Sequence, residues 1–254
     1  MPFAVPPVDT IRKPIFTPGM KVNWEHPLNR ELLCHFPLTE GFGPPQDIVR
    51  NLVPTAALTT IDWAATPIGI GLRFNAANER YVVTAPGYLK ILPPLSIAVR
   101  LIYIGTPSAY SGVFGINYKA APAAPWNAYC LNADINGKPQ LSVNDGTSSI
   151  NSGYFQDVWT FYPFYFVATI PTTTTQFVYT NGQNPLTAFT INMGTGPKYD
   201  ATSQLYLGEQ NPSDNRTSNI VLVDAKIWGR ALSAVEARQE IWNPYGTPDN
   251  PRLI

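Results

Sequence analysis

The chain has little charge, few cysteines and histidines, and no long apolar run. Only 13% of its 254 residues are Asp, Glu, Lys or Arg, and the formal net charge is zero; a typical soluble protein has about 25% charged residues. A neutral, weakly charged surface excludes the basic patch that nucleic acid or an anionic membrane would require. It suits a protein that buries surface against neighbouring chains, because interface cores are depleted of charge. A surface that is simply polar and uncharged fits equally well.

The two cysteines, Cys34 and Cys130, cannot form a disulfide framework. Each lies in an apolar, strand-like run, so we expect two buried free thiols, with one disulfide as the alternative. No run of about 18 apolar residues exists, so no membrane-spanning helix is expected. Residues 1–18 lack the basic start and apolar centre of a secretory signal, so we expect assembly in a host cytoplasm and no membrane insertion.

Most signatures of an enzyme are missing as well. With only His26 and His35, a zinc site or a His-based triad has few possible members, and both residues are expected to be structural. The chain has no phosphate-binding loop and no Gly-x-Ser-x-Gly elbow. It also has no Glu-x-Asp or Asp-x-Glu pair, the spacing that would place two carboxylates on one strand face. We therefore expect no catalytic residues, no cofactor and no enzyme; carboxylates that meet from different strands are the alternative.

Proline, glycine and short alternating runs are abundant instead. With 26 prolines and 18 glycines, the chain is rich in turns, and strand-like runs recur about every 10 residues without helical periods between them. Residues 95–104 form a long central strand in this interpretation, and Asn136-Gly137 predicts a hairpin. This pattern indicates an all-β sandwich. Residues 1–31 and 243–254 are proline-rich, and we predict extended arms there.

The stretch near the end of the chain has the clearest local pattern. From Val221 to Ile227, apolar residues alternate with Asp224 and Lys226, which predicts a half-buried strand. Ser233 and Glu236 have the spacing of a capping box, so a helix should begin there. Its apolar residues are expected to line one side, and the helix should stop at Asn243 because Pro244 follows. The apolar residues in question are Val235, Ile241 and Trp242.

Two stretches resemble the beginning and the end of a known family. Residues 32–43 read Leu-Leu-Cys-His-Phe-Pro-Leu-Thr-Glu-Gly-Phe-Gly, and Ile227-Trp228 is followed by Arg230-Ala231-Leu232-Ser233 and by Glu236. The chain resembles the laminin-G-like, concanavalin-A-like jelly-roll domains of phage and bacterial structural proteins, although Gly229 replaces the usual Asn. The resemblance implies one two-sheet antiparallel β-sandwich over residues 32–242, between an arm at 1–31 and a tail at 243–254.

The same resemblance suggests where ligands would bind. Some family members hold calcium in rim loops, and the loop candidates here are Asp145, Asp214 and Asn215. They are scattered in sequence, so we interpret them as turn residues and predict no metal site. A sugar would need exposed aromatic rings, and Tyr110, Trp126 and Tyr154 lie in loop-like segments; contact with a neighbouring subunit or local packing is the alternative. The remaining tryptophans considered, Trp63, Trp159 and Trp228, are expected in the core.

These observations predict a non-enzymatic structural protein of a viral particle, most simply of a phage. It would be a capsid decoration protein or a tail or fibre component, and its arms would contact neighbouring subunits of the same particle, as in a homo-oligomer. The alternative is a carbohydrate-binding adhesion module that attaches to a cell-surface glycan. The viral assignment follows from the family resemblance, whereas the arms and the low charge are properties of the sequence itself.

Overall fold

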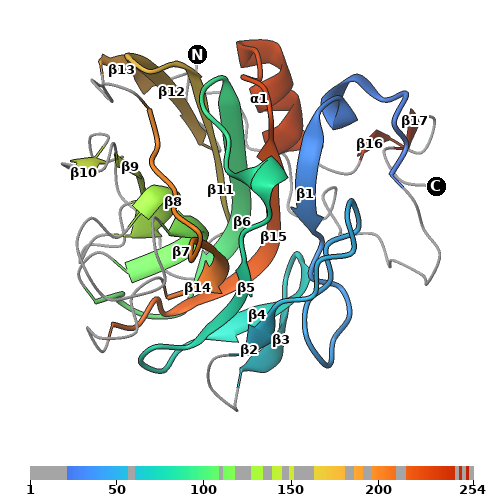
Figure 1. Ribbon diagram of the computed structural model, residues 1–254. Coiled ribbons are helices and arrows are strands. Elements are labelled where there is room, and N and C mark those ends of the chain that lie inside the picture. Colours follow the sequence, from blue (N-terminus) through green and yellow to red (C-terminus); the bar gives the residue numbers. More distant parts are fainter. Residues whose placement is uncertain are drawn as a thin grey trace.

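The described part of the chain is a sandwich of two antiparallel sheets (Figure 1), which confirms the predicted fold class. The computed structural model describes residues 22–56, 61–108, 111–117, 127–133, 139–144, 149–151, 163–180, 186–190, 196–209, 216–243, 246–247 and 250–251. Within these residues, no helix is both long and apolar enough to cross a membrane.

One sheet has eight strands and the other has seven. The eight-stranded sheet runs β13 (Leu186–Thr190), β12 (Thr175–Thr180), β11 (Pro163–Thr172), β6 (Leu95–Tyr103), β15 (Ile220–Trp228), β4 (Gly69–Phe74) and β3 (Asp62–Thr66), and β1 (Leu32–Phe36) also pairs with β15. The seven-stranded sheet runs β10 (Ser149–Asn151), β9 (Pro139–Asn144), β8 (Asn127–Ala133), β7 (Ser111–Asn117), β14 (Gln204–Gly208), β5 (Arg80–Thr84) and β2 (Thr55–Ala56). The predicted central strand and hairpin correspond to β6 and to β8–β9.

The main core lies between the two sheets. In β6, alternate residues point inward because successive side chains of a strand face opposite sides; the inward set is Leu95, Ile97, Val99, Leu101 and Tyr103. Residues of the seven-stranded sheet meet them, and Phe36 packs edge-on against Phe114 with ring centroids 6.4 Å apart. Both thiols are free and buried, as predicted.

A second layer covers the outer face of the eight-stranded sheet. The helix α1 (Ala234–Trp242) begins with the predicted capping box, in which Ser233 and Glu236 bond to each other's backbone. Its buried residues are Ala237, Glu240 and Ile241, of which Ala237 and Ile241 join a separate apolar cluster around Trp228. The helix contacts β11 and β12 of that sheet, and Figure 1 shows it at the top of the view.

Two predictions about this region are wrong. Strand β15 is buried on both faces rather than half-buried, because α1 covers the side that carries Asp224 and Lys226. Of the three apolar residues predicted to line the packed side of the helix, Ile241 is buried, but the other two are not. Val235 and Trp242 are exposed while Glu240 is buried, because Glu240 has a cationic partner below it.

The last ten residues of the predicted arm, residues 22–31, pack on the sandwich; we call this segment the arm root. Val22 and Leu28 belong to the cluster around Trp228, and the short helix η2 (Pro27–Asn29) is capped by the ring of His26. The Trp228 indole donates to the carbonyl of Leu28 at 2.7 Å.

In the tail, β16 (Gly246–Thr247) pairs with β17 (Asn250–Pro251), so the chain turns back there. A further short helix, η3 (Gly87–Leu89), precedes β6.

Candidate functional site

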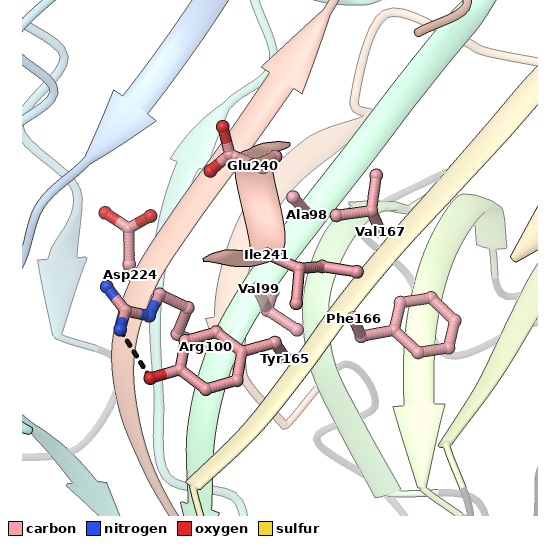
Figure 2. A pocket seen from close by; sticks show the side chains of 9 residues that line it. All are labelled: Ala98, Val99, Arg100, Tyr165, Phe166, Val167, Asp224, Glu240 and Ile241. Atoms are coloured by element: carbon pink, nitrogen blue, oxygen red, sulfur yellow. Dashed lines mark hydrogen bonds between the residues drawn. The ribbon is translucent and has the colours of Figure 1, made fainter. Parts of the chain in front are cut away.

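A group of charged and polar side chains is buried beneath α1, and we call it the charge cluster. Figure 2 shows Glu240 and Ile241 on α1 and, beside them, Arg100, Tyr165 and Asp224 of three neighbouring strands; the Arg100 guanidinium lies between Asp224 and the hydroxyl of Tyr165. These side chains come from β1, β6, β11, β15 and α1, which are far apart in sequence. The members are His35, Arg100, Tyr165, Asp224, Lys226 and Glu240.

A bulge in β15 aims its charged residues at the helix. The pairing of β15 with β6 shifts between Leu222 and Asp224. Before the shift Leu222 points into the main core, and after it Ala225 and Ile227 do so, which leaves Asp224 and Lys226 on the outer face. The register places His35 opposite Lys226 and Arg100 opposite Asp224.

The charge cluster is closed by short contacts. The Nε2 atom of His35 lies 2.7 Å from Asp224 Oδ1. The ammonium of Lys226 lies 2.6 Å from Glu240 Oε1 and 3.2 Å from Asp224 Oδ2, and so ties α1 to β15. The Arg100 guanidinium stacks on the ring of Tyr165, with its Cζ 4.2 Å from the ring centroid, and donates to the Tyr165 hydroxyl.

Burial sets the charges in this cluster. Loss of solvent lowers the pKa of His35, which favours the neutral ring at neutral pH. Burial alone would raise the pKa of Asp224, but Lys226 and His35 together hold it well below its usual range. The His35 ring is therefore neutral and the Asp224 carboxylate is ionised at neutral pH.

A His–Asp pair has the composition of a general base, but this one has no access to a substrate. The cleft that Arg100, Tyr165, Asp224 and Glu240 line leaves no room for a water molecule. A base must reach the proton that it removes, directly or through one water. The charge cluster therefore fits a structural role, in which it holds α1 on the sheet.

A second polar group lies on the outer face of the seven-stranded sheet, and we call it the polar face. In β8 and β9, residues Tyr129, Leu131, Leu141 and Val143 point into the main core. The alternate residues therefore point outward, in register with Tyr206 of β14 and with Glu209 nearby. The outward residues are Cys130, Asn132, Gln140, Ser142 and Asn144. Neither these five residues nor Tyr206 and Glu209 are more than 3% exposed.

Close contacts order the polar face. The Cys130 thiol donates to Asn132 Oδ1 at 3.1 Å, and Glu209 accepts from the backbone N–H of Gly112. Gly115 lies between Tyr206 and Cys130 in the cross-strand row, and a Cβ there would stand 2.5 Å from the Cys130 Cα. Burial raises the pKa of Cys130 to about 12, so the thiol is protonated. Amide and hydroxyl groups of this kind both donate and accept hydrogen bonds.

Most of the predicted site residues lie outside the part of the chain that the structure describes. Tyr110, Trp126 and Tyr154 lie outside the described residues, as do Trp159 and the calcium candidates Asp145, Asp214 and Asn215. Of the other predicted core tryptophans, Trp228 is fully buried, and Trp63 is half-buried and donates to the carbonyl of Gly43. Within the described part of the chain, no three His, Cys, Asp or Glu side chains are grouped so that they could hold a metal ion.

The charge cluster and the polar face were not expected from the sequence. For the charge cluster, one signal was present: Asp224 and Lys226 lie within a strand that leads into a capped helix. A strand followed closely by a helix can be covered by it, which would bury both charges. For the polar face, the signal was the run of amide and hydroxyl residues in β8 and β9.

Comparison with known proteins supports the fold. No family model and no curated protein matches the chain. A Trypanosoma rangeli sialidase in complex with sialic acid aligns with a TM-score of 0.62 and 15% identity over 84% of this chain and 33% of that chain. The binding domain of botulinum neurotoxin DC in complex with rat synaptotagmin II aligns with a TM-score of 0.59 and 12% identity over 83% of this chain and 51% of that chain.

The crystal structure of the binding domain of botulinum neurotoxin serotype D/C aligns similarly, with a TM-score of 0.60 and 12% identity, over 82% of this chain and 51% of that chain. The chain thus spans about a third of the sialidase chain and about half of each toxin chain. At these identities the likeness shows a shared β-sandwich fold.

Proposed function

We propose that this chain is a non-enzymatic structural protein that joins neighbouring subunits of a larger assembly. Residues 32–43 and 227–236 resemble the beginning and the end of phage-encoded laminin-G-like domains. We therefore further propose that the assembly is a phage particle. The observation that carries the proposal is the arm root: a proline-rich arm begins at a fixed point on the sandwich and can reach a neighbour from there.

The arm root is attached by several independent contacts. The side chain of Arg230 donates to the carbonyls of Arg30 and Pro27 at 2.9 and 3.0 Å, and the backbone N–H of Gly229 donates to the carbonyl of Glu31. Leu28 is fully buried. Residues 1–21 contain Pro2, Pro6, Pro7, Pro14 and Pro18. A segment of this composition loses little entropy on binding, because proline already restricts the backbone.

Residues 1–21 are long enough to reach a neighbouring subunit, and the weakly charged surface suits contact with one. Fully extended, 21 residues span about 70 Å, which exceeds the diameter of one domain. The low charge of the chain suits a protein with much of its surface in contact with neighbours. The closed charge cluster also gives a structural reason for the buried His and carboxylates, so these residues need no catalytic role.

Removal of residues 1–21 tests the proposal. The cut should spare the arm root, because Val22 and Leu28 belong to a buried cluster. We expect the truncated protein to sediment as a smaller species than the full chain and to keep the same β-rich circular dichroism spectrum. If the truncated protein sedimented with the same number of chains per particle as the full chain, an assembly role for the arm would be contradicted. Release of sialic acid from a sialylated substrate would contradict the non-enzymatic part.

A second candidate is a carbohydrate-binding adhesion module. The fold favours it, since it is shared with a sialidase that is in complex with sialic acid. A glycan array tests this candidate. Binding that Trp126→Ala abolishes would support it and identify a predicted aromatic contact, whereas no binding at millimolar sugar would remove it.

A further inference from the structure

Three large apolar side chains of the arm root and of α1 are exposed. Trp24 of the arm root is 54% exposed, and Val235 and Trp242 of α1 are 71% and 39% exposed. Val235 and Trp242 are seven positions apart, two turns of a helix, and so lie on the same side of α1. That side faces away from Ala237 and Ile241, which pack on the sheet. Tryptophan is the residue type most enriched among interface hot spots, and two exposed tryptophans near one helix suggest contact with another chain.

The arm root, which carries Trp24, and α1 are neighbours because Arg230 bridges them. Its guanidinium donates to the carbonyl of Pro27 in the arm root and pairs with Glu236 in the first turn of α1 at 2.8 Å. Lys226 then fixes the far end of α1 through Glu240. The arm root, Arg230 and the outer side of α1 therefore form one surface on the outer side of the eight-stranded sheet. We call it the α1 face.

Both proline-rich segments join the sandwich at the α1 face. Residues 1–21 connect at Val22, whose side chain lies in the buried cluster beneath α1. The C-terminal segment connects at Asn243, the residue that ends α1. A partner bound at this face would meet the starting points of both segments at once. Such double attachment raises the effective concentration of the second contact.

The charges of the α1 face suit a second copy of the same chain. Its exposed charged residues include two acids, Glu25 and Glu31, and two bases, Arg30 and Arg238. In a two-fold contact the same patch lies on both partners, so acids of one copy can meet bases of the other. The formal net charge of zero means that no long-range repulsion opposes the approach of two copies.

We propose that the α1 face is a self-association surface, on which Trp24, Val235 and Trp242 of one copy pack against the same residues of a second copy. This inference rests on the proposed assembly role and adds the location of the contact. It assigns the outer side of the eight-stranded sheet to subunit contact and leaves the seven-stranded side free.

The test compares two double variants of the full chain. Trp24→Ser with Trp242→Ser removes the two aromatic contacts. Phe42→Ser with Leu92→Ser is the matched control, because both residues are exposed and apolar but lie elsewhere: Phe42 follows Gly41, which lies beside Ile70 of β4, and Leu92 contacts Gly196. We expect the self-dissociation constant, measured by sedimentation equilibrium, to rise about 30-fold or more for each lost tryptophan contact and to stay unchanged in the control.

Different outcomes separate this inference from the proposed function. If the tryptophan variant keeps the wild-type dissociation constant while removal of residues 1–21 abolishes association, the α1 face is wrong and the assembly role stands. If both double variants weaken association equally, the contact is not located at this face and the inference fails. Val235→Glu provides a second test should the tryptophan variant misfold, because the Val235 side chain is largely exposed and supports no core; a full-strength association of this variant would also overturn the inference.

Discussion

Replacement of Lys226 by Met should destabilise the fold strongly, because it leaves buried carboxylates without their cation. The Lys226 ammonium lies 2.6 Å from Glu240 and 3.2 Å from Asp224, and all three side chains are 2–4% exposed. Breaking one partner of a buried ion pair costs roughly 3–5 kcal/mol, because the remaining charge stays desolvated. Methionine has a similar length, so the loss would reflect charge more than a cavity.

Urea unfolding followed by tryptophan fluorescence measures this loss. With a slope of about 3 kcal/mol per M, the midpoint should fall by about 1–2 M. Arg73→Met is the matched control, because Arg73 and Asp62 form an equally short pair, at 2.6 Å, on the exposed edge of the sheet. That pair should contribute about 0–1 kcal/mol. Equal midpoints for the two variants would refute the argument that the charge cluster holds α1 in place.

Three further predictions follow from buried groups and from the helix cap. Burial lowers the pKa of His35, so the unfolded chain binds its proton first as the pH falls below about 6.5; urea midpoints should therefore drop between pH 7 and pH 5, and less so in His35→Gln. Cys34 and Cys130 are free and buried, so a thiol reagent such as DTNB should react with neither in the native protein and with both in denaturant. Ser233→Ala removes the bonds of the capping box and should cost about 1 kcal/mol in urea unfolding.

Each of these has a contradicting result. A His35→Gln protein with the wild-type pH profile would show that another group controls acid stability. Rapid labelling of a native thiol would mean that Cys34 or Cys130 is reachable from solvent. A Ser233→Ala variant with the wild-type midpoint would show that the N-terminus of α1 contributes little, and would place the stability of the helix in its buried contacts.

Local rules predicted the elements well in the closing stretch of the chain. The alternation of Val221 to Ile227 predicted a strand, and the spacing of Ser233 and Glu236 predicted a helix start; both are present as β15 and the capping box of α1. Strand periodicity and capping depend on neighbours within a few positions, so they can be recognised in a sequence without a structure.

Burial and orientation could not be predicted in the same way, because they depend on distant partners. Asp224 lies within hydrogen-bond distance of His35, 189 positions away, and nothing near Asp224 in the sequence indicates this contact. The same reasoning applies to α1. Val235, Ile241 and Trp242 were expected on the packed side, and only Ile241 is buried; the contact of Glu240 with Lys226 places Glu240 against the sheet instead.

The polar face likewise has a part that the sequence predicts and a part that it does not. Alternation along β8 and β9 is enough to separate the inward Leu131 and Leu141 from the outward Asn132 and Gln140. These outward amides are also buried. Their burial depends on the tertiary structure and cannot be predicted from the alternation. The three loop aromatics, Tyr110, Trp126 and Tyr154, remain predictions.

The mass of the full chain in solution tests the central claim most directly. Light scattering over a range of protein concentrations would give it without a label or a ligand. The account predicts a species of two or more chains of 28.0 kDa that becomes smaller when residues 1–21 are removed. A full-length protein that stays at 28.0 kDa at every concentration would contradict self-assembly through the arm and the α1 face.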